Sequence, residues 1–208
     1  MEDVLALYAL PRDENRPLVC LDEFSKQLLS DVTDPIPLSV NHPIRQDSEY
    51  VREGSATAFM IALPHEGVRH VYFSPTGKRK AVDFAGSIDY LLNTLLPEAE
   101  KVQLVMDNLN THKTASLYEA FPPEKARKLS ERLEIHYTPK HGSWLNMAEI
   151  EIGKLVKSGL KERVPSLDAM KEQVNKYLER VNERPSPIEW QFTNKDARIK
   201  LKHLYSSI

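Results

Sequence analysis

Three acidic residues stand where a folded chain could bring them together. Asp22 ends the apolar run within residues 17–24, Asp107 ends the run of residues 101–107, and Glu149 opens a helical segment. Two buried strands that both run into an aspartate can lie side by side with those ends aligned, and a helix start can add a third carboxylate. Such a cluster can bridge two Mg²⁺ ions, roughly 3.5–4 Å apart, for phosphodiester chemistry.

Ordinary structural roles compete with this interpretation. Asp107 could make an Asx-turn with the residues that follow it. Asn146 and Glu149 have the spacing of a capping box, in which the N-cap and the third helical residue bond each other's backbone N–H groups. The residue types alone leave the catalytic and the structural interpretations open.

Hydrophobic spacing predicts the elements that would position these residues. Strands are predicted at five segments, which are residues 17–24, 56–63, 68–75, 101–107 and 133–138. Helices are predicted at residues 83–96, within 114–133 with a break at Pro122 and Pro123, from Asn146, and from Ser166 as N-cap. Prolines 35, 37 and 43 predict an irregular stretch after the first strand. Three strands followed by alternating helices and strands predict an α/β fold with one mixed sheet and helices on both faces.

Composition restricts the class of protein. Hydrophobic residues make up 41% and charged residues 28% of the chain, as in globular domains with a buried core. The single cysteine, Cys20, excludes an internal disulfide, and no apolar stretch approaches the ~18 residues of a membrane span. The first residues show no basic segment before an apolar run, as a signal peptide would. A cytoplasmic location is therefore expected.

The charge is unevenly distributed along the chain. The formal net charge of −2 argues mildly against a nucleic-acid-binding protein. Residues 138–208, however, hold 13 Lys and Arg against 9 Asp and Glu, whereas residues 1–137 hold 15 against 21. The C-terminal third could therefore face phosphates, and bound metal would offset the acidity elsewhere.

The segments around the three acids resemble the three catalytic blocks of mariner-related DDE transposases, in particular the bacterial insertion sequence 630 family. These segments are VCLDE at 19–23, LVMDNLNTH at 104–112 and HYTPKHGSWLNMAEIE at 136–151. The second contains an Asp-Asn-x-x-x-His block, and the third contains Ser143-Trp-Leu-Asn-Met-Ala-Glu149, which is similar to the family's Ser-x-x-Leu-Asn-x-x-Glu block. The resemblance runs through nearly the whole chain, including the closing residues 190–200.

The resemblance implies a ribonuclease-H-like fold with a mixed five-stranded sheet, and residues 1–208 as a single catalytic domain. It also implies metal-dependent DNA cleavage at transposon ends, followed by strand transfer in which the freed 3′-hydroxyl attacks target DNA. Asp22, Asp107 and Glu149 would hold two Mg²⁺ or Mn²⁺ ions. The expected partners are double-stranded DNA, as transposon ends and as target, and a second copy of the chain in a homodimer.

Two further glutamates compete with these ligands. Glu151 and Glu149 are two residues apart on a helix, so their side chains point about 200° from each other and only one can face the metals. The resemblance places the ligand at Glu149, and Glu151 is then expected to be a solvated charge or a surface ion pair. Glu23 points to the other side of its strand from Asp22 and is expected to support the site indirectly or to lie at the surface.

Other residues near the three blocks are expected to assist. Asn108, His112 and Asn146 are candidates for orienting the ligands. Candidates for DNA contact, by charge or by stacking on a base, are Lys140, His141, Trp144, Lys195, Arg198, Lys200 and Lys202. Packing of Trp144 on the core is the structural alternative for that residue. A zinc site is disfavoured because no histidine pair has ligand spacing and there is one cysteine.

Members of the resembling family usually carry paired helix-turn-helix modules ahead of the catalytic domain. Here the first catalytic aspartate is residue 22, which leaves no room for them. An isolated domain, a split-frame product or a decayed copy is expected, with the end-recognition region separate or missing and with weak, salt-sensitive DNA binding. The alternatives are a catalytically silent remnant, a DNA-binding or regulatory protein that keeps the fold, and a ribonuclease-H-type nuclease or resolvase.

Overall fold

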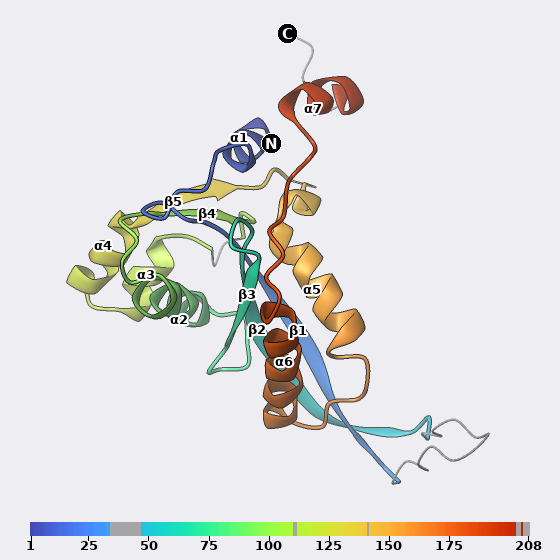
Figure 1. The fold of residues 1–208 in the computed structure, drawn as a ribbon. Coiled ribbons are helices and arrows are strands. Elements are labelled where there is room, and N and C mark those ends of the chain that lie inside the picture. The colour runs from blue at the N-terminus through green and yellow to red at the C-terminus, as the bar shows by residue number, and fades with distance from the viewer. Residues whose placement is uncertain (34–46, 110–111, 141, 203–204, 206–208) are drawn as a thin grey trace.

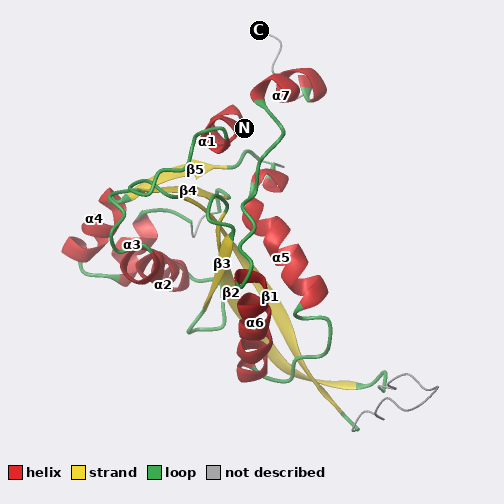
Figure 2. Cartoon of the chain, in the orientation of Figure 1, coloured by secondary structure: helices red, strands yellow, loops and turns green. Residues whose placement is uncertain are grey.

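The computed structural model describes residues 1–33, 47–109, 112–140, 142–202 and 205. They form one mixed sheet with helices on its two faces (Figures 1 and 2). This arrangement confirms the predicted α/β class. The irregular stretch predicted around Pro35, Pro37 and Pro43, and the DNA contact predicted for His141, lie outside the described residues.

All five predicted strands are present, in the spatial order β3-β2-β1-β4-β5. Their bounds are β1 Leu18–Asp31, β2 Tyr50–Leu63, β3 Val68–Phe73, β4 Val102–Met106 and β5 Leu133–Tyr137. β1, β4 and β5 run parallel to one another, whereas β2 is antiparallel to both β1 and β3. β1 and β2 are longer than predicted because they keep pairing with each other as far as Asp31 and Tyr50, at the end of the long arm in Figure 1.

The predicted helices are also present, and two short ones accompany them. Their bounds are α1 Glu2–Tyr8, α2 Ala81–Tyr90 with a π-helical turn Leu91–Leu95, α3 Ala115–Ala120, α4 Pro123–Glu131, α5 Met147–Ser158, α6 Leu167–Asn182 and α7 Asn194–Lys200. α3 and α4 are separated at the predicted proline break, and Ser166 caps α6 through the N–H of Ala169. α1 and α7, with seven residues each, are too short to show a helical period in the sequence.

Alternate residues of β1 belong to two hydrophobic cores. Leu18 and Cys20 pack with α5 and α6, whereas Val19 and Leu21 pack with α2, α3 and α4. A strand buried on both faces reads as an unbroken apolar run, which is why this segment could be recognised in the sequence. Among the described residues, no helix combines the length and apolar character needed to cross a membrane.

Candidate active site

The register of two parallel strands aligns Asp22 with Asp107. Cys20 of β1 lies opposite Val105 of β4, and the same register two residues further on places Asp22 opposite Asp107. β4 ends at Met106, immediately before Asp107. Asp22 was predicted to end its strand, but it lies inside β1 because pairing with β2 continues past it. The sheet thus brings two of the three predicted acids to the point where β4 ends.

Asn146 holds the start of α5 against β1. Its Nδ2 donates to the carbonyl oxygen of Leu21 at 2.9 Å, and its Oδ1 accepts from the N–H of Ala148 at 3.1 Å. Because Leu21 precedes Asp22 and Glu149 lies in the first turn of α5, this one side chain links the third acid to the first. The predicted capping box is not formed at α5, where Asn146 alone makes the cap.

Electrostatic coupling links Asp22 to each of the other two predicted acids. Burial is the largest cause of a rise in the pKa of Asp22 to about 7, and the carboxylates of Glu23, Asp107 and Glu149 contribute to the same rise. The Glu23 backbone N–H donates to Asp22 Oδ1 at 2.9 Å and opposes this rise only partly. The cluster therefore holds more negative charge than its surroundings balance. Carboxylate oxygens are the ligands that Mg²⁺ and Mn²⁺ take in proteins, so this donor set fits such an ion.

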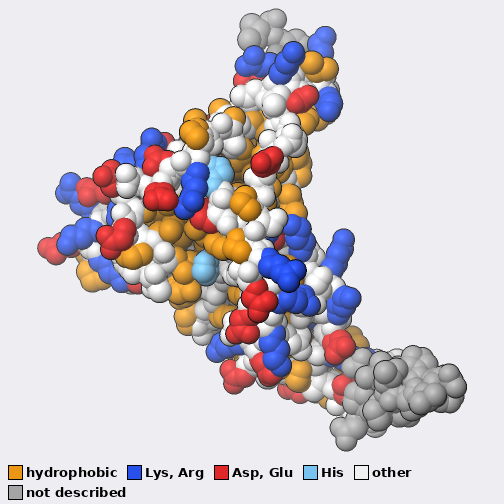
Figure 3. All heavy atoms as spheres, viewed as in Figure 1, with side chains coloured by type: hydrophobic (Ala, Val, Ile, Leu, Met, Phe, Trp, Pro, Cys, Tyr) orange, Lys and Arg blue, Asp and Glu red, His pale blue; other side chains and the backbone are white. Residues whose placement is uncertain are grey.

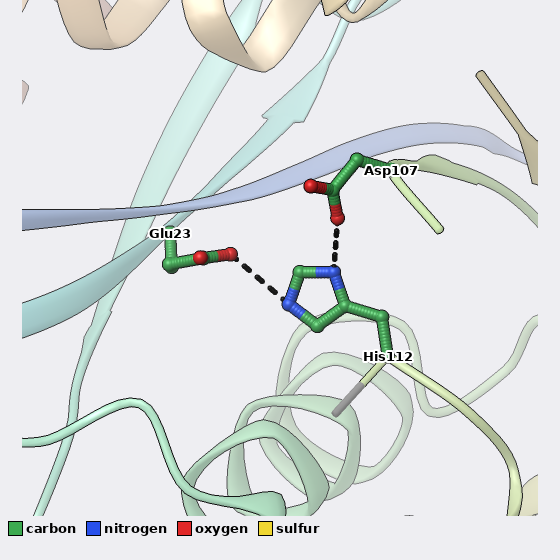
Figure 4. Close-up of side chains that lie close together, drawn as sticks. All are labelled: Glu23, Asp107 and His112. Atoms are coloured by element: carbon green, nitrogen blue, oxygen red, sulfur yellow. Dashed lines mark hydrogen bonds and ion pairs between the residues drawn. The ribbon is translucent and has the colours of Figure 1, made fainter. Parts of the chain in front are cut away.

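A tighter group in the described residues contains Glu23, Asp107 and His112, whose ligand atoms all lie within 4.8 Å of one another (Figure 4). His112 Nδ1 lies 2.5 Å from Asp107 Oδ1, and its Nε2 lies 3.0 Å from Glu23 Oε2. Burial lowers the pKa of His112, but hydrogen bonds to Asp107 and Glu23 outweigh burial and raise it to about 9.

The position of Glu23 corrects one sequence expectation. Its side chain is only 4% exposed and contacts both His112 and Arg79, the latter at 3.3 Å from Oε1. Glu23 does point away from Asp22, as the strand period predicted, yet it is not a surface group. The side it faces is covered by His112, whose position the sequence did not indicate.

The position of Glu151 corrects another. Its carboxylate is 1% exposed and forms an ion pair with Arg69 of β3, with Nε 2.7 Å from Oε2. Lys154 Nζ lies 2.7 Å from Oε1. Burial raises the pKa of Glu151, but these two cations outweigh burial and lower it. Glu151 shares the buried side of α5 with Ala148 and Leu155, so it is neither solvated nor part of a surface pair, and its carboxylate is held by Arg69.

Part of the predicted DNA-contacting set lies beside Asp107. A cleft of about 490 Å³ is lined by Asp107, Asn108, Leu109, Thr138, Pro139, Lys140 and Ser143. Trp144 follows directly along the chain and is 41% exposed. Its ring stacks on Trp190 at a centroid distance of 6.4 Å and meets Phe192 edge-on at 5.6 Å, so the packing considered as its structural alternative is present. Trp144 lines a second pocket, and Lys140 lines both that pocket and the cleft beside Asp107.

The C-terminal basic residues occupy a different place. Arg198 forms two contacts with Glu2, at 2.7 and 2.6 Å, and Lys200 Nζ lies 5.7 Å from the centre of the Phe192 ring. Lys195 and Lys202 are exposed. Figure 1 shows α7 beside α1 and apart from the sheet, and Figure 3 shows Lys and Arg side chains there and over α5, mixed with acidic ones. The viewed face therefore lacks a continuous basic surface.

We predict that Asn146→Ala destabilises the fold more than loss of a helix cap alone. The substitution removes the cap of α5 and a buried hydrogen bond to Leu21, together worth roughly 2 kcal/mol. Ser166→Ala is the matched control because Ser166 caps α6 through a single bond to Ala169, worth about 1 kcal/mol. Urea denaturation compares the two; equal losses would show that the bond to β1 contributes nothing.

Comparison with solved structures supports this fold assignment. The chain resembles the Mos1 mariner paired end complex with Mn and the Mos1 strand transfer complex, each with a TM-score of 0.56 and 13% identity. The alignments cover 86% and 88% of this chain but 52% and 55% of those chains, so this chain spans about half their length. A third similar structure, the Mos1 transposase paired-end complex with left transposon end, has 14% identity and the same TM-score. The predicted ribonuclease-H-like fold is thereby confirmed.

Comparison of sequences identifies the family. No curated protein sequence matches the chain. Residues 17–171, well over half of the chain, match the family model described as DDE superfamily endonuclease. This range includes Asp22, Asp107, Asn146 and Glu149, and ends within α6. The chain belongs to the DDE superfamily endonucleases.

Proposed function

We propose that this chain is the catalytic domain of a transposase of the bacterial insertion sequence 630 type, which cuts DNA and joins the freed 3′ end to target DNA. The observation that carries the proposal is the coupled cluster of Asp22, Asp107 and Glu149, formed by the β1–β4 register and by the Asn146 link. Family membership and the fold shared with Mos1 complexes support it. On this proposal residues 1–208 act as one domain.

Asp22, Asp107 and Glu149 would hold two divalent ions, Mg²⁺ or Mn²⁺. Such ions, when bound, lower the pKa of the attacking water or 3′-hydroxyl and stabilise the leaving oxygen. The fit rests on the chemistry of the donor set and on the carboxylates of Glu23, Asp107 and Glu149, which add to burial in raising the pKa of Asp22 and whose charge a cation would balance. One of the similar structures, the Mos1 paired end complex, contains Mn.

The remaining residues of the site would place the DNA. Asn108 and Lys140 line the cleft beside Asp107, where an amide and an ammonium group can bind phosphate oxygens. The exposed side of Trp144 offers a flat surface for a base or a sugar next to the cut. Asn146 keeps α5 against β1, so the position of Glu149 relative to Asp22 is set before DNA arrives.

Cleavage assays with different nucleic acids test the proposal. With Mn²⁺, the unsubstituted chain is expected to nick double-stranded DNA, and removal of the ion with a chelator is expected to stop the reaction. RNA–DNA hybrid and double-stranded DNA should be compared in parallel. Cleavage confined to the RNA strand of the hybrid would indicate a ribonuclease-H-type nuclease instead. Metal binding without cleavage of either substrate would indicate a silent protein that keeps the fold.

A further inference from the structure

The imidazole of His112 lies between two carboxylates that come from different strands (Figure 4). Nδ1 faces Asp107 Oδ1 at 2.5 Å, and Nε2 faces Glu23 Oε2 at 3.0 Å. We propose that Glu23, acting through His112, positions the carboxylate of Asp107. The inference rests on the proposed function, since it concerns how Asp107 is prepared to bind a divalent ion.

The three groups differ in how firmly the fold holds them. Glu23 lies inside β1, paired with Phe59 of β2, and its side chain is 4% exposed. Asp107 follows the last residue of β4, and its side chain is 31% exposed. The fold therefore holds the carboxylate of Glu23 in place, whereas the carboxylate of Asp107 needs a partner to hold its orientation.

His112 is held as firmly as Glu23. It is 1% exposed, and its ring packs against Phe84 of α2 at a centroid distance of 5.0 Å. Its carbonyl oxygen accepts from the Tyr137 hydroxyl at 3.0 Å, and its N–H donates to the Leu109 carbonyl oxygen at 3.0 Å. Because its backbone and one face of its ring are both held, His112 can fix the orientation of Asp107 relative to Glu23.

The chemistry of the contacts favours positioning over simple core packing. Two apolar side chains in place of Glu23 and His112 would fill the same space at a lower desolvation free energy than a buried carboxylate and a buried imidazole. The polar pair instead holds one oxygen of Asp107, and hydrogen-bonded partners of ligating groups typically change metal affinity by about 10–100-fold when they are removed. The guanidinium of Arg79, 3.3 Å from Glu23 Oε1, helps to hold the Glu23 carboxylate in place.

Mn²⁺ titration of the protein, monitored by calorimetry together with melting curves, tests the inference. Glu23→Ala is expected to weaken Mn²⁺ binding about 10–100-fold because Asp107 loses its fixed orientation. Glu23→Gln is expected to stay within about threefold of the unsubstituted chain, since its amide oxygen can take the place of Oε2, 3.0 Å from His112 Nε2. Asp83→Ala is the matched control: Asp83 is also a buried carboxylate, bonded to Ser74 and Thr76, and its loss should lower the melting temperature without changing Mn²⁺ affinity.

The variants separate positioning from charge and from stability. If Glu23→Gln weakens binding as much as Glu23→Ala, the negative charge is what matters and the inference is overturned. Unchanged affinity in Glu23→Ala also overturns it, while leaving the proposed function intact. Absence of Mn²⁺ binding in the unsubstituted chain overturns the proposed function and the inference together. If Glu23→Ala does not fold, Glu23→Met, which fills a similar volume without an acceptor, carries the same expectation.

Discussion

Asp107→Asn is expected to abolish the thermal stabilisation of this protein by Mn²⁺ or Mg²⁺. A ligand that binds only the folded state adds about 2.7 kcal/mol at a hundredfold excess over its dissociation constant, which for a domain of this size is roughly 5–10 °C in melting temperature. Continuing the β1–β4 register two residues past Cys20 and Val105 places Asp107 opposite Asp22, so an ion bound there would need both carboxylates. The measurement is a melting curve with and without millimolar metal.

Asp22→Asn gives a stricter test, because it should lose the rise in melting temperature caused by metal without losing stability in the absence of metal. Burial and neighbouring carboxylates raise the pKa of Asp22 from 3.8 to about 7, so the metal-free fold loses stability as the pH rises between these two values, and the full loss is present above pH 7. Asparagine has no charge to bury. At pH 8 the metal-free melting temperature of Asp22→Asn should therefore be equal to or higher than that of the unsubstituted chain.

Asp168→Asn provides the matched control, since the Asp168 side chain is 93% exposed at the start of α6. It should retain the full metal response. A shift that persists in Asp22→Asn and in Asp107→Asn would show that the ions bind elsewhere. No shift in the unsubstituted chain would count against a metal site at this end of β4.

The sequence allowed the elements near the site to be predicted because their signals are local. β4 is buried along all of Val102–Met106 and therefore reads as an unbroken apolar run. Asn146 stands directly before an amphipathic segment and caps it, as its type predicts. The outer parts of β1 and β2 carry no such signal: residues 50–55 are exposed, and only pairing with β1 makes them a strand.

Glu151, which was assigned to the surface, and Glu23, for which a surface position was one of two expectations, show what local patterns leave out. Strand and helix periods correctly predicted the sides to which Glu23 and Glu151 point. Whether those sides are solvated depends on partners distant in the sequence, such as Arg69, which is 82 residues from Glu151. A charged residue reads as exposed unless its counter-ion is known, because unpaired buried charges are rare. The buried partners His112 and Arg69 could be placed only once the sheet was assembled.

Burial of Glu151 changes what its substitution should do. Removing one member of a buried ion pair costs about 3–5 kcal/mol because the partner is left without a counter-ion. Glu151→Gln is therefore expected to lower stability by about 3 kcal/mol, roughly 6–12 °C, rather than by the small amount expected of a surface group. Arg69→Gln breaks the same contact from the other side and should lower stability to a similar extent.

Glu149→Gln is expected to have the opposite profile: intact stability and loss of cleavage. The carboxylate of Glu149 takes no part in capping α5, which Asn146 performs alone, so a neutral isostere should fold normally. If Glu149 is the third ligand, metal-dependent nicking of double-stranded DNA should fall by at least about 1,000-fold, some 4 kcal/mol in activation free energy. Glu151→Gln, assayed well below its lowered melting temperature, should keep most of its activity per folded molecule.

The comparison distinguishes the two glutamates because stability and cleavage should change in different variants. Arg69→Gln serves as the control for destabilisation, since it leaves both glutamates in place and should cleave like Glu151→Gln. If Glu149→Gln retains cleavage while Glu151→Gln loses it and Arg69→Gln does not, then Glu151 must leave Arg69 to bind the ion, and the assignment of Glu149 is wrong. If Glu151→Gln and Arg69→Gln lose cleavage equally, the buried pair holds α5 in the orientation that Glu149 needs. Loss of cleavage in Glu149→Gln without loss of stability is the result that the geometry predicts.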